Sequence, residues 1–280
     1  MTHPLYDYFN WLKSLQNHIQ LETFFGFRDF PSTETLPEFS LPSPASLEEI
    51  PTYFEPESSP EAIFVTEKSI STSPQESKQG VSLSRLSPEI KKSGLAQLEQ
   101  QVAKCTACRL ASTRSQTVFG YGNPNAKLVF IGEAPGADED RQGIPFVGKA
   151  GQLLTRIIES IHMTREEIYL MNLIKCRPPG NREPKADEIE LCRSFFLSQL
   201  NYLDPKIICT LGKFASQNLL NTTLPISRLR GEVFYWNSIP VIPTFHPSYL
   251  LRNESEKRKV WEDMKKIRDL LEALQEKNKK

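Results

Sequence analysis

Residues 127–161 read KLVFIGEAPGADEDRQGIPFVGKAGQLLTRIIESI: an apolar run, a polar loop and a segment with helical periodicity. The run over 127–132 is built mainly from Leu, Val, Phe and Ile, which suits a strand that is buried on both faces. The apolar residues of 148–161 recur at the spacing of one helix face. This stretch therefore predicts a strand, a loop and a helix that belong to a parallel sheet.

The same alternation continues along the chain. Three further apolar runs have the length of strands, and segments with helical periodicity separate them. We expect strands over 167–172, 206–212 and 240–246, helices over 185–200 and 213–220, and a charged amphipathic helix over 255–275. Strands that alternate with helices form parallel sheets with helices on both faces. The predicted fold is therefore α/β, a three-layer α/β/α sandwich around a short parallel sheet.

The composition is that of an ordinary globular protein, since 39% of the 280 residues are apolar and 24% are charged. It excludes a collagen, a pure coiled coil and a disulfide-knotted miniprotein. No run approaches the roughly 18 to 20 apolar residues of a membrane-spanning helix, and the N-terminus lacks the basic and apolar regions of a secretory signal. We expect a cytoplasmic monomer that does not act at a membrane.

The net charge of zero hides two unlike parts. Residues 1–90 carry thirteen acidic and five basic side chains, a balance of −8, so residues 91–280 carry +8. Ten of the 21 prolines also fall in 1–90, and a segment so rich in Pro, Ser and Glu buries too little surface to offset its ordering entropy. The sequence predicts a mostly disordered acidic extension over 1–90 and a globular domain over 91–280, which is basic enough to bind a polyanion.

Polar side chains stand where three of the predicted strands end. Glu133 follows the first strand, Asn172 ends the second and His246 ends the fourth. The carboxyl ends of parallel strands meet at one edge of the sheet, where α/β proteins place their reactive groups. Alone, Glu133 or His246 would more often be a helix cap or a structural hydrogen-bond partner. The three together indicate a site.

Four of the five cysteines have the spacing C-x2-C-x67-C-x15-C, formed by Cys105, Cys108, Cys176 and Cys192. Four thiolates suit either a tetrahedral zinc ion or an iron–sulfur cube, and the number of ligands does not choose between them. A zinc site of this kind would normally have a second closely spaced pair of cysteines. This sequence lacks one, and Cys192 lies inside a predicted helix, so the spacing favours the wider iron–sulfur cluster. Cys209 lies in a predicted strand and is expected to be a buried apolar residue.

Several motifs in order resemble the family 4 uracil-DNA glycosylases, the iron–sulfur branch of that superfamily. They are KCTACRL (104–110), the stretch from FGYGNPNA to KAGQLL (119–154), NLIKCRPPGNREP (172–184) and TFHPSYLLR (244–252). The resemblance covers about residues 95–270 and does not extend to 1–90. It implies a uracil-DNA glycosylase-like fold, release of uracil from DNA in base excision repair, and a [4Fe-4S] cluster held by Cys105, Cys108, Cys176 and Cys192.

The resemblance also implies how the base is recognised. Phe146 matches the residue that stacks on the base, and Gly132 and Ala134 let the backbone approach it. Asn172 can accept a hydrogen bond from uracil N3–H through its carbonyl and donate one to O4 through its amide, whereas cytosine presents the opposite pattern. His246 matches the histidine near uracil O2.

Bond cleavage leaves a cationic sugar and a uracil anion, so groups that favour either charge lower the barrier. His246 would draw off the negative charge. Glu133 would favour the cation or orient the attacking water, and Glu139 is a second candidate that the sequence does not separate from it. The CRPP motif runs directly into its helix without a histidine, so we expect turnover rather than covalent trapping on DNA.

The motif HPSYLLR offers a contact with DNA. Tyr249, Leu250 and Leu251 form an apolar wedge, and Arg252 beside them suits a phosphate. The alternative is a loop at a helix start that packs on the core.

Residues 5–27 have near-helical spacing of apolar groups and predict an amphipathic helix that packs on its own domain or docks on a partner. Within it, residues 20–25, QLETFF, loosely resemble the short peptides that dock on sliding clamps.

Two other functions compete with this interpretation. One is a non-catalytic, metal-bearing DNA-binding module, against which the three intact strand-end polar residues argue. The other is a zinc-dependent base deaminase, which needs an H-x-E motif that this sequence lacks.

Overall fold

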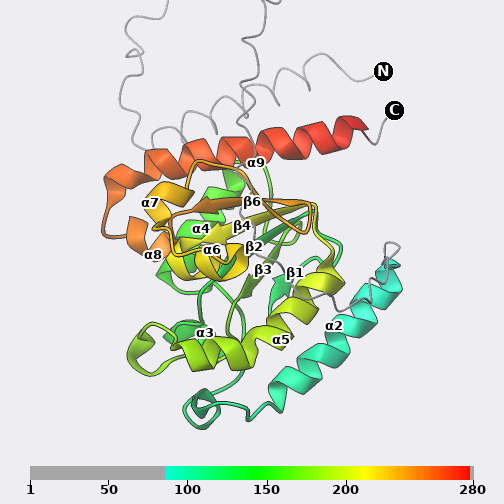
Figure 1. Cartoon of the computed structure of the whole chain (residues 1–280), viewed down its shortest axis with the longest axis vertical. Coiled ribbons are helices and arrows are strands. Elements are labelled where there is room, and N and C mark those ends of the chain that lie inside the picture. The colour runs from blue at the N-terminus through cyan, green and yellow to red at the C-terminus, as the bar shows by residue number, and fades with distance from the viewer. Residues whose placement is uncertain (1–85, 278–280) are drawn as a thin grey trace, which may run out of the picture. The chain divides into compact units, whose positions relative to one another are not determined.

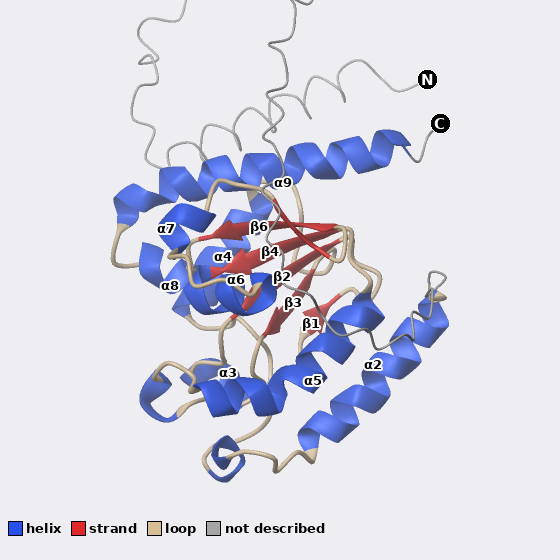
Figure 2. Cartoon of the chain, in the orientation of Figure 1, coloured by secondary structure: helices blue, strands red, loops and turns tan. Residues whose placement is uncertain are grey.

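The computed structural model describes residues 86–277, which form a six-stranded sheet with helices on both faces (Figures 1 and 2). The strand order is β1-β3-β2-β4-β6-β5. The four central strands are parallel, and the edge strands β1 and β5 are antiparallel to their neighbours. The strands are β1 (Tyr121–Gly122), β2 (Leu128–Gly132), β3 (Tyr169–Asn172), β4 (Ile207–Leu211), β5 (Phe234–Trp236) and β6 (Ile239–Thr244).

The helices connect these strands and cover the sheet. The α-helices of the described residues are α2 (Pro88–Ala103), α3 (Ala137–Gln142), α4 (Lys149–Glu159), α5 (Ala186–Leu203), α6 (Gly212–Leu220), α7 (Ile226–Leu229), α8 (Pro247–Leu250) and α9 (Lys257–Lys277). Short 3-10 turns are η3 (Arg109–Ser112), η4 (Pro179–Asn181) and η5 (Glu254–Glu256). In Figure 1, α9 crosses the β6 end of the sheet, and α2 lies along α5.

Side chains alternate along each central strand, so the sheet contributes to two cores. Leu128 and Phe130 of β2 pack with α4 and α9 on one face, whereas Val129 and Ile131 pack with α2, α5 and α6 on the other. All four side chains are fully buried. A sheet covered on both faces requires such continuous apolar strands, and the result is the predicted three-layer α/β/α sandwich.

A buried ion pair ties α9 to the sheet. The Asp263 carboxylate of α9 is fully buried and accepts hydrogen bonds from the Arg230 guanidinium at 2.5 and 3.1 Å and from the Thr244 hydroxyl at 2.6 Å. Arg230 follows α7 and Thr244 ends β6. Because a buried charge without partners is costly, this pairing fixes how α9 packs on the strand before His246.

The sequence prediction of the fold is confirmed. Each of the four strands and four helices expected in the globular part is present, with ends that differ by three residues or fewer. The antiparallel edge strands and α2 were not predicted. β1 has only two residues and β5 is half-exposed, so neither gives a buried apolar run. Helix α2 contains Gly94, which weakens a helical pattern in the sequence. The structure explains this glycine, because a Cβ atom there would lie 2.3 Å from the Tyr202 ring of α5.

Helix α2 begins at Pro88 with Ser87 as its N-cap, so the described domain starts slightly before the predicted boundary at residue 91. The rest of the extension 1–90, the helix at 5–27 and the segment 20–25 lie outside the described residues. No described helix is long and apolar enough to cross a membrane.

Candidate active site

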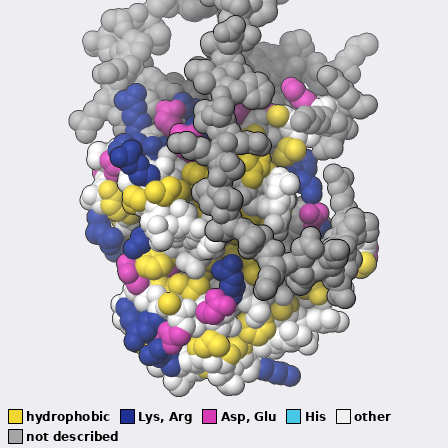
Figure 3. Space-filling view, in the orientation of Figure 1, with side chains coloured by type: hydrophobic (Ala, Val, Ile, Leu, Met, Phe, Trp, Pro, Cys, Tyr) yellow, Lys and Arg dark blue, Asp and Glu magenta, His cyan; other side chains and the backbone are white. Residues whose placement is uncertain are grey.

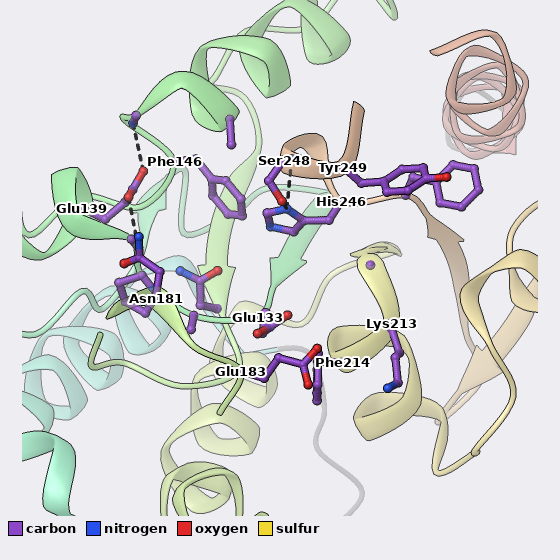
Figure 4. Close-up of a pocket in the computed structure, with 18 of the residues that line it drawn as sticks. Glu133, Glu139, Phe146, Asn181, Glu183, Lys213, Phe214, His246, Ser248 and Tyr249 are labelled. Carbon is purple, nitrogen blue, oxygen red and sulfur yellow. Dashed lines mark hydrogen bonds between the residues drawn. The ribbon is translucent and has the colours of Figure 1, made fainter. Parts of the chain in front are cut away.

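The three strand-end polar residues meet in one cavity of about 910 Å³ at the carboxyl edge of the sheet (Figure 4). Glu133 follows β2, Asn172 ends β3, and His246 lies two residues beyond β6. The expected convergence is therefore observed. Ala134, Glu139, Phe146 and Tyr249 also line this cavity.

Asn172 presents an unused hydrogen-bond acceptor to this cavity. Its side chain is only 2% exposed, and its Oδ1 has no hydrogen-bond partner among the described residues. Its backbone carbonyl accepts a hydrogen bond from the buried Lys175 ammonium at 2.7 Å. A buried polar atom without a partner is costly, so Oδ1 is suited to a ligand that brings a donor.

Gly132 lies opposite Asn172 in the pairing of β2 with β3. A Cβ atom at this position would lie 2.3 Å from Asn172 Oδ1 and 2.5 Å from Phe146 Cζ. Only glycine leaves the Asn172 amide and the Phe146 ring in these places.

Phe146 supplies a flat apolar surface. The residue is only 7% exposed, and its ring centroid lies 6.2 Å from that of His246. Its backbone is left-handed, with φ of 57°. Residues other than Gly, Asn and Asp seldom adopt this conformation, so other contacts must hold it.

The contacts of His246 determine its tautomer. The Ser248 backbone N–H donates to His246 Nδ1 at 3.2 Å, and the Ser248 hydroxyl lies 2.7 Å from the same nitrogen. Burial, together with the nearby positive charge of Arg252, lowers the pKa of His246 to about 4. The imidazole is therefore neutral near pH 7. Because Nδ1 is an acceptor, Nε2 carries the proton.

Glu133 has an altered acidity. Burial raises the pKa of this carboxyl to about 7, the negative charge of Glu183 adds to the increase, and Lys213 opposes it. All three side chains line the cavity, and Figure 4 shows the Glu133 and Glu183 carboxylates facing the same space. A group with a pKa near 7 in a cavity is typical of an active site.

The contacts of Glu139 differ from those of Glu133. One carboxylate oxygen accepts from the backbone N–H groups of Val147 and Gly148, both at 2.9 Å, and the other accepts from Gly136 at 3.1 Å. Glu139 thus joins the loop after β2 to the loop that carries Phe146. It lines the cavity, but its oxygens are already bound to backbone amides.

The predicted wedge is only partly accessible. Tyr249 is 37% exposed and Leu251 is 45% exposed, and Arg252 is also exposed. Leu250 is fully buried in the core, so its predicted contact with DNA is wrong. The short helix α8 turns Leu250 inward and its neighbours outward. On the face in Figure 3, Lys and Arg side chains are frequent along the left edge, where α7 and α8 lie in Figure 1, with Asp and Glu side chains among them.

Four cysteines, from three segments far apart in the sequence, line a second, mostly apolar cavity: Cys105, Cys108, Cys176 and Cys192. An Arg114 N–H donates to Cys176 Sγ at 3.1 Å, and another donates to the Cys105 carbonyl at 2.7 Å. In residues 86–277, no three His, Cys, Asp or Glu side chains are close enough together to hold a single metal ion. Cys209 is buried in β4, as predicted.

The sequence interpretation missed Glu183 and Lys213. Glu183 lies within the NREP motif and Lys213 begins the segment 213–220, but neither follows the strand-end pattern that identified Glu133. Only the folded chain brings them to the same cavity.

A buried amide, a flat ring and a neutral imidazole around one cavity suit a planar ligand with hydrogen-bonding edges. The model of the uracil DNA glycosylase superfamily matches residues 119–265, which include these groups. This is the class of protein to which the fold and the site point.

Similar proteins specify the family. A type-4 uracil-DNA glycosylase of Thermotoga maritima is 42% identical over 178 residues, which cover 62% of this chain and 93% of that protein. Type-4 enzymes of Archaeoglobus fulgidus and Sulfurisphaera tokodaii are 40% and 39% identical, each over 63% of this chain and over 92% and 84% of their own lengths. The chain therefore belongs to family 4 of the uracil-DNA glycosylases.

Proposed function

We propose that this uracil-DNA glycosylase binds a flipped-out deoxyuridine in the cavity at the sheet edge. Hydrolysis of its N-glycosidic bond releases uracil and leaves an abasic site in DNA, as base excision repair requires. The observation that carries this proposal is the buried, unpartnered Asn172 Oδ1 beside Gly132, where the missing side chain leaves room for this oxygen and for the Phe146 ring.

Recognition of the base follows from this arrangement. Asn172 Oδ1 accepts from uracil N3–H, its amide donates to O4, and the Phe146 ring stacks on the base. Gly132 provides the space and Ala134 brings the backbone close. Cytosine has an acceptor at N3 and a donor at N4. It would therefore place an acceptor opposite Asn172 Oδ1 and a donor opposite the Asn172 amide N–H.

Cleavage uses the neutral histidine and the nearby carboxylate. The Nε2–H of His246 donates to uracil O2 and stabilises the negative charge that develops on the leaving base. Glu133 in its ionised form stabilises the cationic sugar or orients the attacking water. We assign this role to Glu133 rather than Glu139, because backbone amides occupy both Glu139 oxygens.

We assign contact with the surrounding DNA to the exposed residues of the HPSYLLR motif. Tyr249 lies at the cavity, and Leu251 and Arg252 are exposed beside it. We propose that Tyr249 and Leu251 pack against the bases that flank the flipped nucleotide and that Arg252 binds a phosphate.

The chemistry of the donor set fits the iron–sulfur cluster of the resemblance. Cys105, Cys108, Cys176 and Cys192 share one apolar cavity, and Arg114 places a positive charge beside it. Each thiolate of a cube binds a different iron, so its ligands stand farther apart than around a single ion. When bound, the [4Fe-4S] cluster supplies a structural cross-link between these segments and no step of bond cleavage.

Changing Asn172 to Asp tests the recognition of the base. The substitution removes the amide donor and places an anion opposite uracil O4, which costs about 1–3 kcal/mol or more. We expect uracil excision to fall tenfold to a hundredfold, with residual activity shifted toward cytosine. Single-turnover rates on uracil- and cytosine-containing oligonucleotides measure this.

Asn181→Asp is the matched control, because Asn181 lines the same cavity and its Oδ1 already accepts from Arg177 at 2.7 Å. It should change the rate less than about threefold. A wild-type rate for Asn172→Asp, with chemistry confirmed as the limiting step, would show that Asn172 does not recognise the base.

The pH dependence tests the role of Glu133. Because its ionised form is the active one, kcat/KM should rise with pH and level off above a midpoint near 7. Glu183→Gln removes the charge that helps to raise this pKa, so the midpoint should move to lower pH, whereas Lys213→Met should move it to higher pH. His246 stays neutral over this range.

Glu256→Gln is the control, since Glu256 lines the cavity but pairs with Lys259. It should leave the midpoint in place. A flat profile between about pH 5.5 and 8.5, or an unmoved midpoint in Glu183→Gln, would remove Glu133 from this role.

Metal content tests the cluster. The protein purified without oxygen should be brown and hold about four irons per chain, because four thiolates bind one cube. Cys108→Ala should lose the iron, and Cys209→Ala, which changes the buried cysteine of β4, should keep it. Stoichiometric zinc without iron would overturn the assignment.

We also propose, from the sequence alone, that residues 20–25 dock on a sliding clamp. Deleting residues 1–90 also removes the first residues of α2, so a deletion of 1–85 is the better test. It should abolish binding to the clamp and leave excision from naked oligonucleotides intact. Absence of clamp binding by the full-length chain would remove the idea.

A further inference from the structure

We infer that Arg165 is a positioning residue for base recognition, which acts by holding the backbone of Phe146. Arg165 lies in the loop between α4 and β3, and its side chain reaches the loop before α4. This inference rests on the proposed stacking role of Phe146.

The guanidinium of Arg165 binds two successive carbonyl groups. Its Nη1 donates to the Phe146 carbonyl at 2.9 Å, and its Nη2 donates to the Pro145 carbonyl at 2.9 Å. Nη1 also lies 3.3 Å from the Thr155 hydroxyl. A planar fork with fixed donors is suited to such paired acceptors, and a lysine is not.

Within residues 86–277, Arg165 donates its hydrogen bonds to these two carbonyls and to Thr155, and not to a carboxylate. Its guanidinium carbon lies 5.5 Å from the centre of the Tyr121 ring. The negative charges of Glu166 and Glu139 act on it, but no carboxylate of residues 86–277 is close enough to form an ion pair with it. Partial burial lowers its pKa. The half-buried Arg165 guanidinium therefore binds backbone carbonyls of the Phe146 loop rather than a carboxylate.

The peptide bond between Phe146 and Val147 is fixed at both ends. Its carbonyl accepts from Arg165, and its N–H donates to Glu139 at 2.9 Å on the opposite side. These two hydrogen bonds set the orientation of the peptide plane and hence the backbone of Phe146, whose φ of 57° is otherwise unfavourable. At Gly151 a Cβ atom would lie 1.9 Å from the Phe146 carbonyl oxygen, so α4 also approaches this peptide closely.

Phe146 forms a wall between two cavities. One is the base-binding cavity, and the other is lined by Tyr121, Thr155 and Arg165. Without the Arg165 hydrogen bonds, the loop can relax toward a right-handed backbone and carry the ring away from the base. The base would then lose its stacking partner, while the surface that binds the DNA backbone would stay unchanged.

The test combines Arg165→Met with Phe146→Ala in a double-mutant cycle. Two quantities are measured. One is the single-turnover rate of uracil excision. The other is a ratio of affinities, in which the affinity for an oligonucleotide with cleavage-resistant 2′-fluoro-deoxyuridine is divided by the affinity for one with a tetrahydrofuran abasic analogue. We expect Arg165→Met to lower the rate and this ratio by about tenfold to a hundredfold, with affinity for the abasic analogue within twofold of wild type. In the Phe146→Ala background, Arg165→Met should add less than about a twofold change.

Two further variants keep the result interpretable. Arg165→Lys retains the charge but only one carbonyl contact, so it should give an intermediate loss, and it replaces Arg165→Met if that variant fails to fold. Arg141→Met removes the charge of an exposed side chain of α3 and should leave the affinity ratio unchanged.

The outcomes separate the two proposals. Additive losses in the double variant, or an equal loss of affinity for both oligonucleotides, would overturn the role of Arg165 and leave that of Phe146 standing. A wild-type rate and ratio in Phe146→Ala would overturn the stacking role itself and the inference that rests on it.

Discussion

The register between β2 and β3 sets the geometry on which the site depends. Gly132 pairs with Asn172 at the last position of the two strands, so the Asn172 amide lies directly beside a residue without a side chain. A shift of either strand by one residue would turn its side chains to the other face of the sheet and separate this pair, because successive side chains point to opposite faces. The buried strands around them leave no such freedom, since both faces carry tightly packed apolar side chains.

The cysteine cavity and the proposed base-binding cavity are built on a shared segment. Asn172 ends β3, and Cys176 follows four residues later. Between them, the fully buried Lys175 binds the Asn172 carbonyl and the Gln199 side chain of α5, the helix that carries Cys192. Glu188 of the same helix pairs with Arg182, which lines the base-binding cavity, and with Arg109, which follows Cys108. The proposed cluster thus lies next to the walls of the site.

The sequence predicted the fold and the strand-end residues because both follow from short-range patterns. Buried parallel strands produce continuous apolar runs, and the residue after such a run has a known place at the sheet edge. The error at Leu250 arose because four residues of helix are too short to show which side faces the core. The contacts of Glu139 and Arg165 with the Phe146 loop join residues whose types give no signal of a partner, since the acceptors and donors are backbone groups.

No group of residues 86–277 offers a hydrogen bond to the buried Asn172 Oδ1, and a buried acceptor that stays unpaired is costly. An apolar side chain of similar size would remove a penalty of about 1–3 kcal/mol, which is a large fraction of the net stability of a typical domain. Selection for thermal resistance alone would therefore act against this asparagine. In the function proposed above, stability is exchanged for selectivity at this point, and a matching base that enters and supplies the missing donor would reverse the exchange.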